Sequence, residues 1–282
     1  NLFLVMGTDN IEWLRGWKNI DKILDKCIVY LVPRPGFPIT ESDKKELLTL
    51  NCRYETADFI GADGSSTLVP VANAFGKLRE VVPEKVAEYI ESKKLYKQYF
   101  FVRDLYEKYN VKKSRVEHTY GVVKAAIILA GIYGADVKKT ILASLLHDCG
   151  KYVTVRDLEQ KGFCFDDEAK SALPPVEHCY TSEAIARCDL KINDEEVLRA
   201  IRLHTTGDEN MSTLEKIVFC ADYIEEGRTT PGVEQIRKKI LFDLDGAMLD
   251  ILGATINYLK SKNAEIDKRT LACRDRLVKT IK

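Results

Sequence analysis

Ile141-Leu-Ala-Ser-Leu-Leu-His-Asp-Cys-Gly150 is an apolar run that ends in a histidine–aspartate pair. The apolar residues favour a buried helix, and Gly150 is typical of a helix terminator. His147 and Asp148 are therefore predicted at a helix end. Adjacent helical residues point about 100° apart, so both side chains reach one metal ion most easily where the chain can bend around it.

The other histidines extend this pair into a pattern. The chain has four histidines in all, and none precedes position 118. Together with two aspartates they give the order H…HD…H…H…D, formed by His118, His147, Asp148, His178, His204 and Asp222. Histidine is the commonest metal ligand near neutral pH, and mixed His/Asp sets suit transition metals that act on phosphate esters.

Helical periodicity places two of these residues on buried faces. Val197, Ala200 and Ile201 precede His204 at helical spacing,. Asp222 extends an equivalent stripe, formed by Leu214, Ile217, Val218 and Ala221. Taken alone, such a histidine is more often a satisfied core residue, and Asp222 could pair with a buried arginine. The six residues together favour a metal site, because an unpaired carboxylate on a core face is costly.

Six candidate ligands exceed what one ion needs beside open positions for water. They fit two divalent metal ions about 3.5–4 Å apart that share a carboxylate. Two cations lower the pKa of a bound water toward neutrality and so supply the nucleophile. The imidazole–carboxylate set favours iron, with manganese as the alternative, over a structural zinc.

Composition is that of a cytoplasmic protein. The 282 residues carry 43 basic and 43 acidic side chains, so net charge gives no case for binding nucleic acid or a membrane,. No apolar run approaches the roughly 20 residues of a membrane span, and no secretory signal opens the chain. The eight cysteines include no C-x-x-C pair. Cys149, Cys179 and Cys220 are interpreted as small buried thiols in a reducing compartment.

Residues 96–282 are predicted to form an all-α domain, because only helical runs follow Gln98. Gly131-Ile-Tyr-Gly134, Pro174-Pro175 and Pro231-Gly232 mark breaks between helices,. Five segments carry a family resemblance, namely Arg115-Val-Glu-His-Thr-Tyr-Gly-Val122, Leu145-Leu-His-Asp-Cys-Gly-Lys151, Ala200-Ile-Arg-Leu-His-Thr-Thr-Gly207, Lys216-Ile-Val-Phe-Cys-Ala-Asp-Tyr-Ile-Glu225 and Arg228-Thr-Thr-Pro-Gly-Val233. In this order they resemble an HD-domain phosphohydrolase of the YqeK-like branch.

That branch is associated with symmetrical cleavage of bis(5'-nucleosyl)-tetraphosphates, so the resemblance implies conversion of diadenosine tetraphosphate to two ADP. It also implies that Asp148 bridges the two ions. His118, His147 and Asp222 would hold one ion, and His178 and His204 the other. One departure is Ser182, which stands where the family usually has a glycine after its third histidine.

Further residues are candidates for catalysis and substrate binding. Lys151 and Arg228 are predicted to hold substrate phosphates, against the alternative of solvated surface cations. Thr205, Thr206 and Gly207 would line the pocket or simply cap a helix. Lys216 is the fourth substrate-binding candidate, although it also fits the polar face of its helix.

Residues 1–95 are predicted to be a partial α/β domain. Phe3–Met6 and Cys27–Val32 are expected as buried strands of a parallel, Rossmann-like sheet, with a helix from Asn10 to Lys26 between them,. The region resembles the second half of a NadD-type nicotinate-nucleotide adenylyltransferase, on Met6-Gly-Thr-Asp9, Trp13-Leu-Arg-Gly-Trp17, Arg34-Pro-Gly36, Ser65-Ser-Thr67 and Val82-Pro83.

Two departures separate this region from a working transferase. That family's G-G-T-F-D-P-x-H-x-G-H segment is absent, and Pro70 stands where its S-S-T-x-x-R motif has arginine. The sequence also begins with Asn1, inside an apolar segment. We therefore expect a fragment of a longer fusion that would carry the missing half of the adenylyltransferase domain, and a docking scaffold here.

The sequence as a whole predicts a nucleotide hydrolase that acts on a small-molecule nucleotide and is linked by fusion to NAD biosynthesis. It leaves the oligomeric state open, with a homo-dimer as one candidate. One alternative is another HD nucleotidase, such as a nucleoside triphosphatase or an alarmone hydrolase. Another is a nucleotide sensor or adaptor that regulates nicotinate-nucleotide adenylyltransferase activity. Cyclic-dinucleotide phosphodiesterases are disfavoured because no G-Y-P follows the histidine–aspartate pair.

Overall fold

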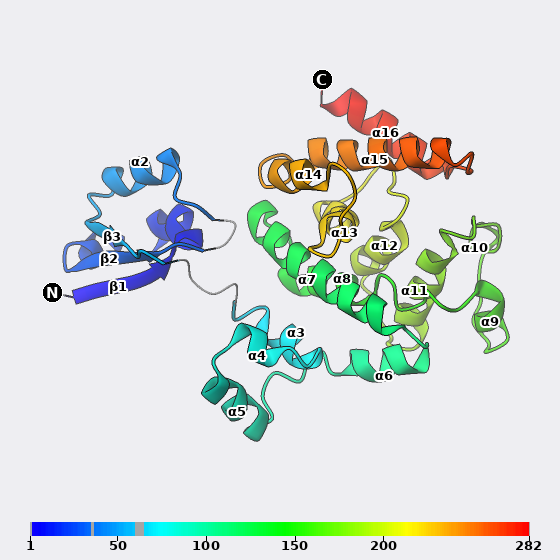
Figure 1. Cartoon of the computed structure of the whole chain (residues 1–282), viewed down its shortest axis with the longest axis horizontal. Coiled ribbons are helices and arrows are strands. Elements are labelled where there is room, and N and C mark those ends of the chain that lie inside the picture. The colour runs from blue at the N-terminus through cyan, green and yellow to red at the C-terminus, as the bar shows by residue number, and fades with distance from the viewer. Residues whose placement is uncertain (1, 35–36, 60–64, 282) are drawn as a thin grey trace. The chain divides into compact units, whose positions relative to one another are not determined.

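The computed structural model describes residues 2–34, 37–59 and 65–281. They form two compact units (Figure 1). The sheet unit holds the described residues up to Val69 and Leu78–Tyr89, and the helical unit holds Pro70–Lys77 and the chain from Ile90 onward. The predicted fold class, a small α/β region followed by a helical domain, is confirmed. Asn1, Pro35 and Gly36, on which part of the sequence argument rests, lie outside the described residues.

The sheet unit is built on three parallel strands in the order β1-β2-β3. Their bounds are Leu2–Gly7, Cys27–Val32 and Tyr54–Thr56. Side chains alternate along β2, so that Cys27, Val29 and Leu31 are buried,. The helices packed with this sheet are η1 (Thr8–Gly16), α1 (Ile20–Leu24) and α2 (Glu41–Thr49).

The single helix predicted from Asn10 to Lys26 is wrong. A 3-10 helix, η1, ends at Gly16, and α1 begins only at Ile20. Trp17 is extended, and Asn19 has a left-handed backbone with φ of 58°. Asparagine tolerates that conformation better than most residues, and glycine is a poor helix former, so the chain turns between Gly16 and Asn19.

Residues Pro70–Lys77, which include all but the first residue of helix α3 (Val69–Ala74), belong to the helical unit. Asn73 Nδ2 donates a hydrogen bond to the Leu95 carbonyl at 3.0 Å, and Arg103 Nε donates to the Ala74 carbonyl at 2.6 Å. The Phe75 and Tyr120 ring centroids lie 5.3 Å apart. Helices α4 (Leu78–Val81) and α5 (Glu84–Ser92) follow, and their residues as far as Tyr89 belong to the sheet unit. The domain boundary after residue 95 stays a prediction.

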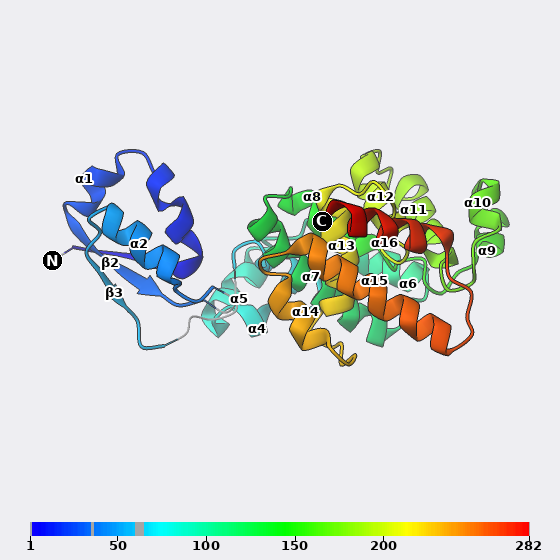
Figure 2. The ribbon, with the colours of Figure 1, turned by 90° about the horizontal axis from the view of Figure 1, so that it is seen from above.

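The remaining described helices belong to the helical unit. Their bounds are α6 Phe101–Lys108, α7 Lys113–Tyr133, α8 Val137–Leu146, α9 Val155–Glu159, α10 Asp167–Lys170, α11 Glu177–Cys188, α12 Glu195–Leu203, α13 Thr213–Ile224, α14 Val233–Lys239, α15 Leu244–Ser261 and α16 Lys268–Thr280. Figure 2 shows α15 and α16 side by side, and α15 also packs on α13. Buried residues of α7, α13 and α15, among them Ala126, Ala221 and Ile251, form a common core.

Helix ends in this unit fall where the sequence predicts breaks. Gly134 ends α7 with φ of 66°, and Gly232 precedes α14 with φ of 84°,. Helix α8 begins at Val137, after the N-cap Asp136, and ends at Leu146, which places His147 at the C-cap. Helix α12 ends at Leu203, so His204 has the same relation to its helix. Among the described residues, no helix is long and apolar enough to cross a bilayer.

Candidate metal centre

The helical unit brings all six predicted ligands into one cluster. They come from five helices: α7 supplies His118, the end of α8 supplies His147 and Asp148, α11 supplies His178, the end of α12 supplies His204, and α13 supplies Asp222. His147, Asp148, His178 and His204 are buried. The distribution over five helices explains why the residues are far apart in sequence and close in space.

Asp148 lies at the centre, and its two carboxylate oxygens face different histidines. Oδ2 lies 3.3 Å from His147 Nε2 and 4.0 Å from His118 Nε2. Oδ1 lies 3.2 Å from His178 Nε2 and 3.6 Å from His204 Nε2. A carboxylate so placed can bind one cation through each oxygen.

Backbone carbonyls fix the orientation of two imidazoles. His147 Nδ1 lies 2.7 Å from the Ser144 carbonyl, and His204 Nδ1 lies 2.7 Å from the Ile201 carbonyl. A carbonyl oxygen only accepts, so each Nδ1 must carry the proton and donate it. In the neutral ring the lone pair is therefore on Nε2, the atom that faces Asp148.

The Glu225 carboxylate fixes the orientation of the His118 imidazole. Its Nδ1 donates to Glu225 Oε1 at 3.0 Å, while its Nε2 lies 2.9 Å from Asp222 Oδ1. Glu225 is buried, and its other oxygen accepts from the Gly227 amide at 2.6 Å. Gly121 on α7 leaves room for this carboxylate, because a Cβ there would lie 2.6 Å from Glu225 Oε2.

The electrostatics keep the carboxyl groups ionised. Burial opposes ionisation, yet the imidazoles of His147, His178 and His204 hold the pKa of Asp148 well below its usual range. Burial also opposes ionisation of Asp222, but its hydrogen bond with His118 lowers the pKa of that carboxyl group. For His118, burial lowers the pKa, but the hydrogen bonds with Asp222 and Glu225 outweigh burial and raise the pKa above 6.5.

Three polar atoms in this cluster fit a metal role. Within the described part of the chain, His118 Nε2, His147 Nε2 and Asp148 Oδ1 are buried and receive no well-directed hydrogen bond, although charged groups lie nearby. Leaving a buried polar atom without a partner is unfavourable. The atoms are of the kind that bind transition metals, so a bound cation accounts for their arrangement. The His/Asp groups imply one or more divalent metal ions.

Three cations surround the cluster. Lys151 Nζ lies 2.8 Å from His178 Nε2 and 3.5 Å from Asp148 Oδ1. Arg228 donates from Nη2 to Asp222 Oδ1 at 2.7 Å and from Nε to the Asp222 carbonyl at 3.0 Å. Arg115 Nη1 lies 2.8 Å from Asp148 Oδ2. The two predicted phosphate-binding cations therefore lie at the cluster, but their roles stay predictions.

The substrate-binding candidates divide between the cluster and other places. Thr205 Oγ1 lies 3.3 Å from His178 Nε2. Thr206 donates to the Gly207 carbonyl at 3.0 Å, and Gly207 has φ of 66° in the turn after α12. Lys216 pairs with Asp245 at 2.6 Å in a separate cavity of about 410 Å³ that Arg276 also lines. The structure does not bring Lys216 to the metal cluster.

Ser182 has a specific role at the family's glycine position. Its hydroxyl accepts a hydrogen bond from the Gly150 amide at 2.9 Å. A Cβ on Gly150 would lie 2.6 Å from the Ser182 amide nitrogen, so the turn after Asp148 packs directly on α11. The serine therefore ties this turn to the helix that carries His178.

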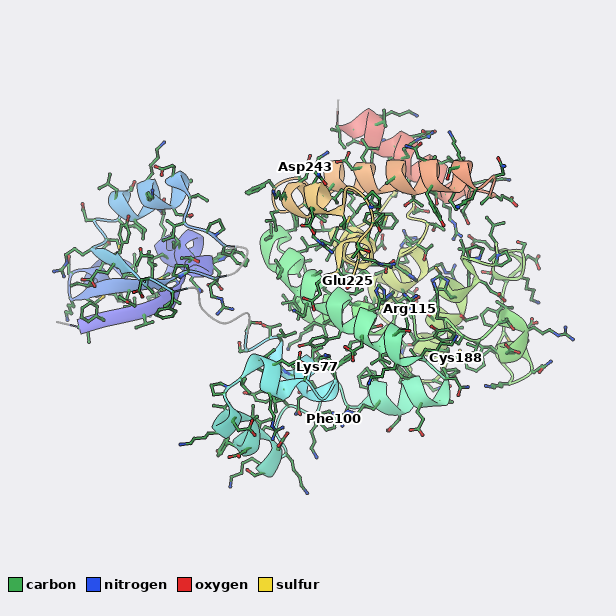
Figure 3. All side chains as sticks on the ribbon, viewed as in Figure 1. Lys77, Phe100, Arg115, Cys188, Glu225 and Asp243 are labelled. Atoms are coloured by element: carbon green, nitrogen blue, oxygen red, sulfur yellow. The ribbon has the colours of Figure 1, made fainter. Side chains whose placement is uncertain are left out.

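Sequence reasoning missed Arg115 and Glu225 as functional residues, both labelled in Figure 3. Each had a signal. Arg115 precedes His118 by three residues on one helix, and Glu225 follows Asp222 by three at the end of α13,. Both spacings place the charged group beside a candidate ligand.

Comparisons with known proteins agree with this site. The HD domain family matches residues 115–227. A symmetrical bis(5'-nucleosyl)-tetraphosphatase from Halalkalibacterium halodurans is 42% identical over 178 residues, which cover 60% of this chain and 91% of that protein. A crystal structure of a predicted HD superfamily hydrolase involved in NAD metabolism, from Clostridium acetobutylicum, is 34% identical with a TM-score of 0.58, covering 65% of this chain and 98% of that one.

A third relative extends across both units. A probable nicotinate-nucleotide adenylyltransferase/Ap4A hydrolase from Mycoplasma genitalium is 26% identical over 235 residues, or 80% of this chain and 61% of that protein. The sheet unit is thus similar to the adenylyltransferase part of a fused relative.

Fold and site together define a metal-dependent phosphohydrolase with an HD domain. The chain belongs to the family of symmetrical bis(5'-nucleosyl)-tetraphosphatases. The family resemblance predicted from the sequence motifs is confirmed.

Proposed function

We propose that this protein hydrolyses diadenosine tetraphosphate symmetrically to two ADP with two divalent metal ions. The observation that carries the dinuclear site is the position of Asp148, whose two oxygens face two separate sets of imidazoles. The similarity to symmetrical bis(5'-nucleosyl)-tetraphosphatases from Halalkalibacterium halodurans and Staphylococcus aureus supports the substrate. The fused relative supports a link to NAD biosynthesis.

In this proposal one ion is held by His118, His147 and Asp222, the other by His178 and His204, and Asp148 is shared. When bound, the ions activate water and neutralise charge on the attacked phosphoryl group. Iron is the preferred metal and manganese the alternative, because the ligands are imidazoles and carboxylates. The protein's own contribution is to orient Nε2 of His118, His147 and His204 through their Nδ1 hydrogen bonds,.

The cations around the cluster would position the tetraphosphate. Lys151 and Arg228 hold phosphates on either side of the attacked one, and Arg115 adds a third cation beside Asp148. Arg228 has a fork geometry suited to phosphate oxygens. Its hydrogen bonds to described residues use Nε and Nη2, so the guanidinium is already oriented by Asp222. Thr205, Thr206 and Gly207 would close the pocket near His178.

Chromatography of the products tests this function. The iron- or manganese-loaded protein is incubated with diadenosine tetraphosphate, and ADP is expected as the only nucleotide product. In heavy-oxygen water the label should enter one of each pair of ADP molecules. AMP and ATP in equal amounts would refute symmetrical cleavage while leaving the metal site intact.

The same assay separates the alternatives. A nucleotide sensor binds the tetraphosphate without consuming it, so tight binding with no turnover at any metal loading would favour that class. Faster turnover of a nucleoside triphosphate or an alarmone would favour another HD nucleotidase. Each substrate should be compared by kcat/KM at one metal loading.

A further inference from the structure

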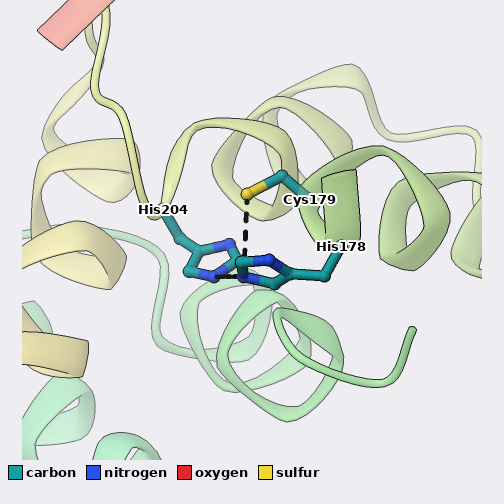
Figure 4. A group of neighbouring side chains, drawn as sticks. All are labelled: His178, Cys179 and His204. Atoms are coloured by element: carbon teal, nitrogen blue, oxygen red, sulfur yellow. Dashed lines mark hydrogen bonds between the residues drawn. The ribbon is translucent and has the colours of Figure 1, made fainter. Parts of the chain in front are cut away.

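Cys179 lies at one end of the metal cluster, beside two of the proposed ligands (Figure 4). It is the third residue of α11, directly after His178, and it is fully buried. Its Sγ lies 3.8 Å from His178 Nε2, which in turn lies 3.1 Å from His204 Nε2. All three potential ligand atoms lie within 4.8 Å of one another.

A buried carboxylate oxygen points to the same place. Asp148 Oδ1 faces His178 Nε2 at 3.2 Å and His204 Nε2 at 3.6 Å. It receives no well-directed hydrogen bond from any described residue, and the Asp148 side chain is 3% exposed. The imidazole nitrogens of His178 and His204 therefore have both a buried carboxylate oxygen and a buried thiol sulfur as neighbours.

The spacing suits a single ion. With metal–sulfur bonds of about 2.3 Å and metal–nitrogen bonds of about 2.0–2.1 Å, ligand atoms of one tetrahedral site lie roughly 3.3–3.6 Å apart. The observed distances of 3.1 Å for nitrogen to nitrogen and 3.8 Å for nitrogen to sulfur bracket that range. The ligand atoms of His178, His204 and Cys179 are therefore close enough to share one ion.

A neighbouring cysteine provides the contrast. Cys149 follows Asp148 directly and is equally buried, but its Sγ points to the Ser182 carbonyl at 3.7 Å. Proximity to a ligand in sequence is therefore insufficient to bring a thiol to the cluster. Of these two cysteines, only Cys179 belongs to a group of potential metal ligands.

We propose that Cys179 is a thiolate ligand of the ion held by His178, His204 and Asp148 Oδ1. The inference rests on the metal site of the proposed function and adds a ligand to it. The metal–sulfur bond forms as the S–H bond breaks, and the thiol proton leaves to solvent. A thiolate favours zinc, cobalt and ferrous ions over manganese and magnesium, so the two ions of this protein differ in metal preference.

Cobalt substitution tests the ligand directly. The metal-free 282-residue protein is titrated with Co²⁺ without substrate, while bound cobalt and near-ultraviolet absorption are followed. A thiolate-to-cobalt charge-transfer band should grow with one of the two ions and be absent from Cys179→Ser. Cys149→Ser is the matched control and should keep the band. Zinc-over-manganese selectivity should fall about tenfold or more in Cys179→Ser.

The outcomes separate this inference from the proposed function. Wild-type protein that binds two cobalt ions with no such band overturns the thiolate ligand, whether or not Cys179→Ser folds. A band lost in Cys149→Ser but kept in Cys179→Ser also overturns it. Because no substrate is present, a band in a protein that fails to cleave diadenosine tetraphosphate upholds the ligand and refutes only the activity. Failure to bind cobalt at all overturns both.

Discussion

The sheet unit and the helical unit both resemble nucleotide enzymes, but they differ in what they retain. The helical unit contains all four histidines of the chain and gathers them around Asp148. The described sheet unit has strands β1–β3 and a compact core around Leu31, but no cluster of potential metal ligands among its described residues. Pro70 stands where the transferase motif has its arginine, and it packs with the helical unit.

The difference teaches that a fold resemblance carries function only where the reacting groups persist. In the helical unit, the motif residues, the hydrogen bonds that support them and their burial all agree with the family resemblance. In the sheet unit, the parallel strands agree with the resemblance, but Pro70, which belongs to the helical unit, stands where the resemblance implies an arginine. Substitutions in the two units test this difference, because they should abolish, weaken or leave intact metal binding and hydrolysis.

The largest effect is expected from Asp148→Ala. If both oxygens bind metal, the variant should lose both ions and more than about 1,000-fold in hydrolysis rate, beyond the effect of removing a single electrostatic donor. Elemental analysis of anaerobically purified protein should fall from about two transition-metal ions per chain to none.

His178→Ala is the control for this change, because its ring faces only one oxygen of Asp148. It should keep one ion. An Asp148→Ala protein that still binds one ion tightly would show that Asp148 is a ligand of a single metal. Thermal unfolding of the metal-free variants should be compared, so that loss of metal is not mistaken for loss of fold.

A smaller effect is expected from Arg228→Ala. Removing a cation that stabilises charge on the reacting phosphates should lower kcat about 100-fold with metal content unchanged. Arg228→Lys keeps the charge without the fork and should give an intermediate rate. Since Arg228 also bonds Asp222, a rate loss matched by metal loss would instead assign it a supporting role.

Glu225→Gln should weaken the binding of only one of the two metal ions. Glu225 accepts two hydrogen bonds, from His118 Nδ1 and the Gly227 amide, and a glutamine has only one acceptor oxygen for them,. Such outer partners typically change metal affinity by about 10–100-fold, so excess metal should restore activity. Glu226→Gln is the matched control, because that neighbouring side chain is exposed and pairs with Lys124. Equal losses in both variants would contradict a specific role.

The pH dependence of metal binding should involve the same pair. Asp222 and Glu225 raise the pKa of His118 above 6.5, so the metal-free protein holds a proton that a metal must displace,. The stabilisation from this charged histidine is present at low pH and is lost as pH rises through the raised pKa. Affinity should therefore increase as the pH rises through the raised pKa of His118, and Glu225→Gln should shift that rise to lower pH,. Calorimetric titration with Co²⁺ measures both.

The sequence predicts some of these features and misses others for a physical reason. The order of histidines and the helix end after Leu146 were enough to predict a shared metal site, because helical periodicity is local,. The bridging place of Asp148 came from the family resemblance. The partner of His118 was missed, because the approach of Glu225 depends on how α7 packs against α13. The broken helix near Asn19 and the packing of α3 with the helical unit likewise depend on contacts between residues distant in sequence.

The smallest effect is expected from changes in the sheet unit. Thr67→Ala, in the Ser65–Thr67 motif, should leave hydrolysis of diadenosine tetraphosphate within about twofold of wild type, as expected for surface changes away from a site. This 282-residue chain should also form no dinucleotide from ATP and nicotinate mononucleotide. Adenylyl transfer depends on positive groups at the departing pyrophosphate, and Pro70 replaces one of them,. Dinucleotide formation that survives the double change Asp148→Ala and Lys151→Ala would place adenylyl transfer outside the metal cluster and make the two units functionally alike.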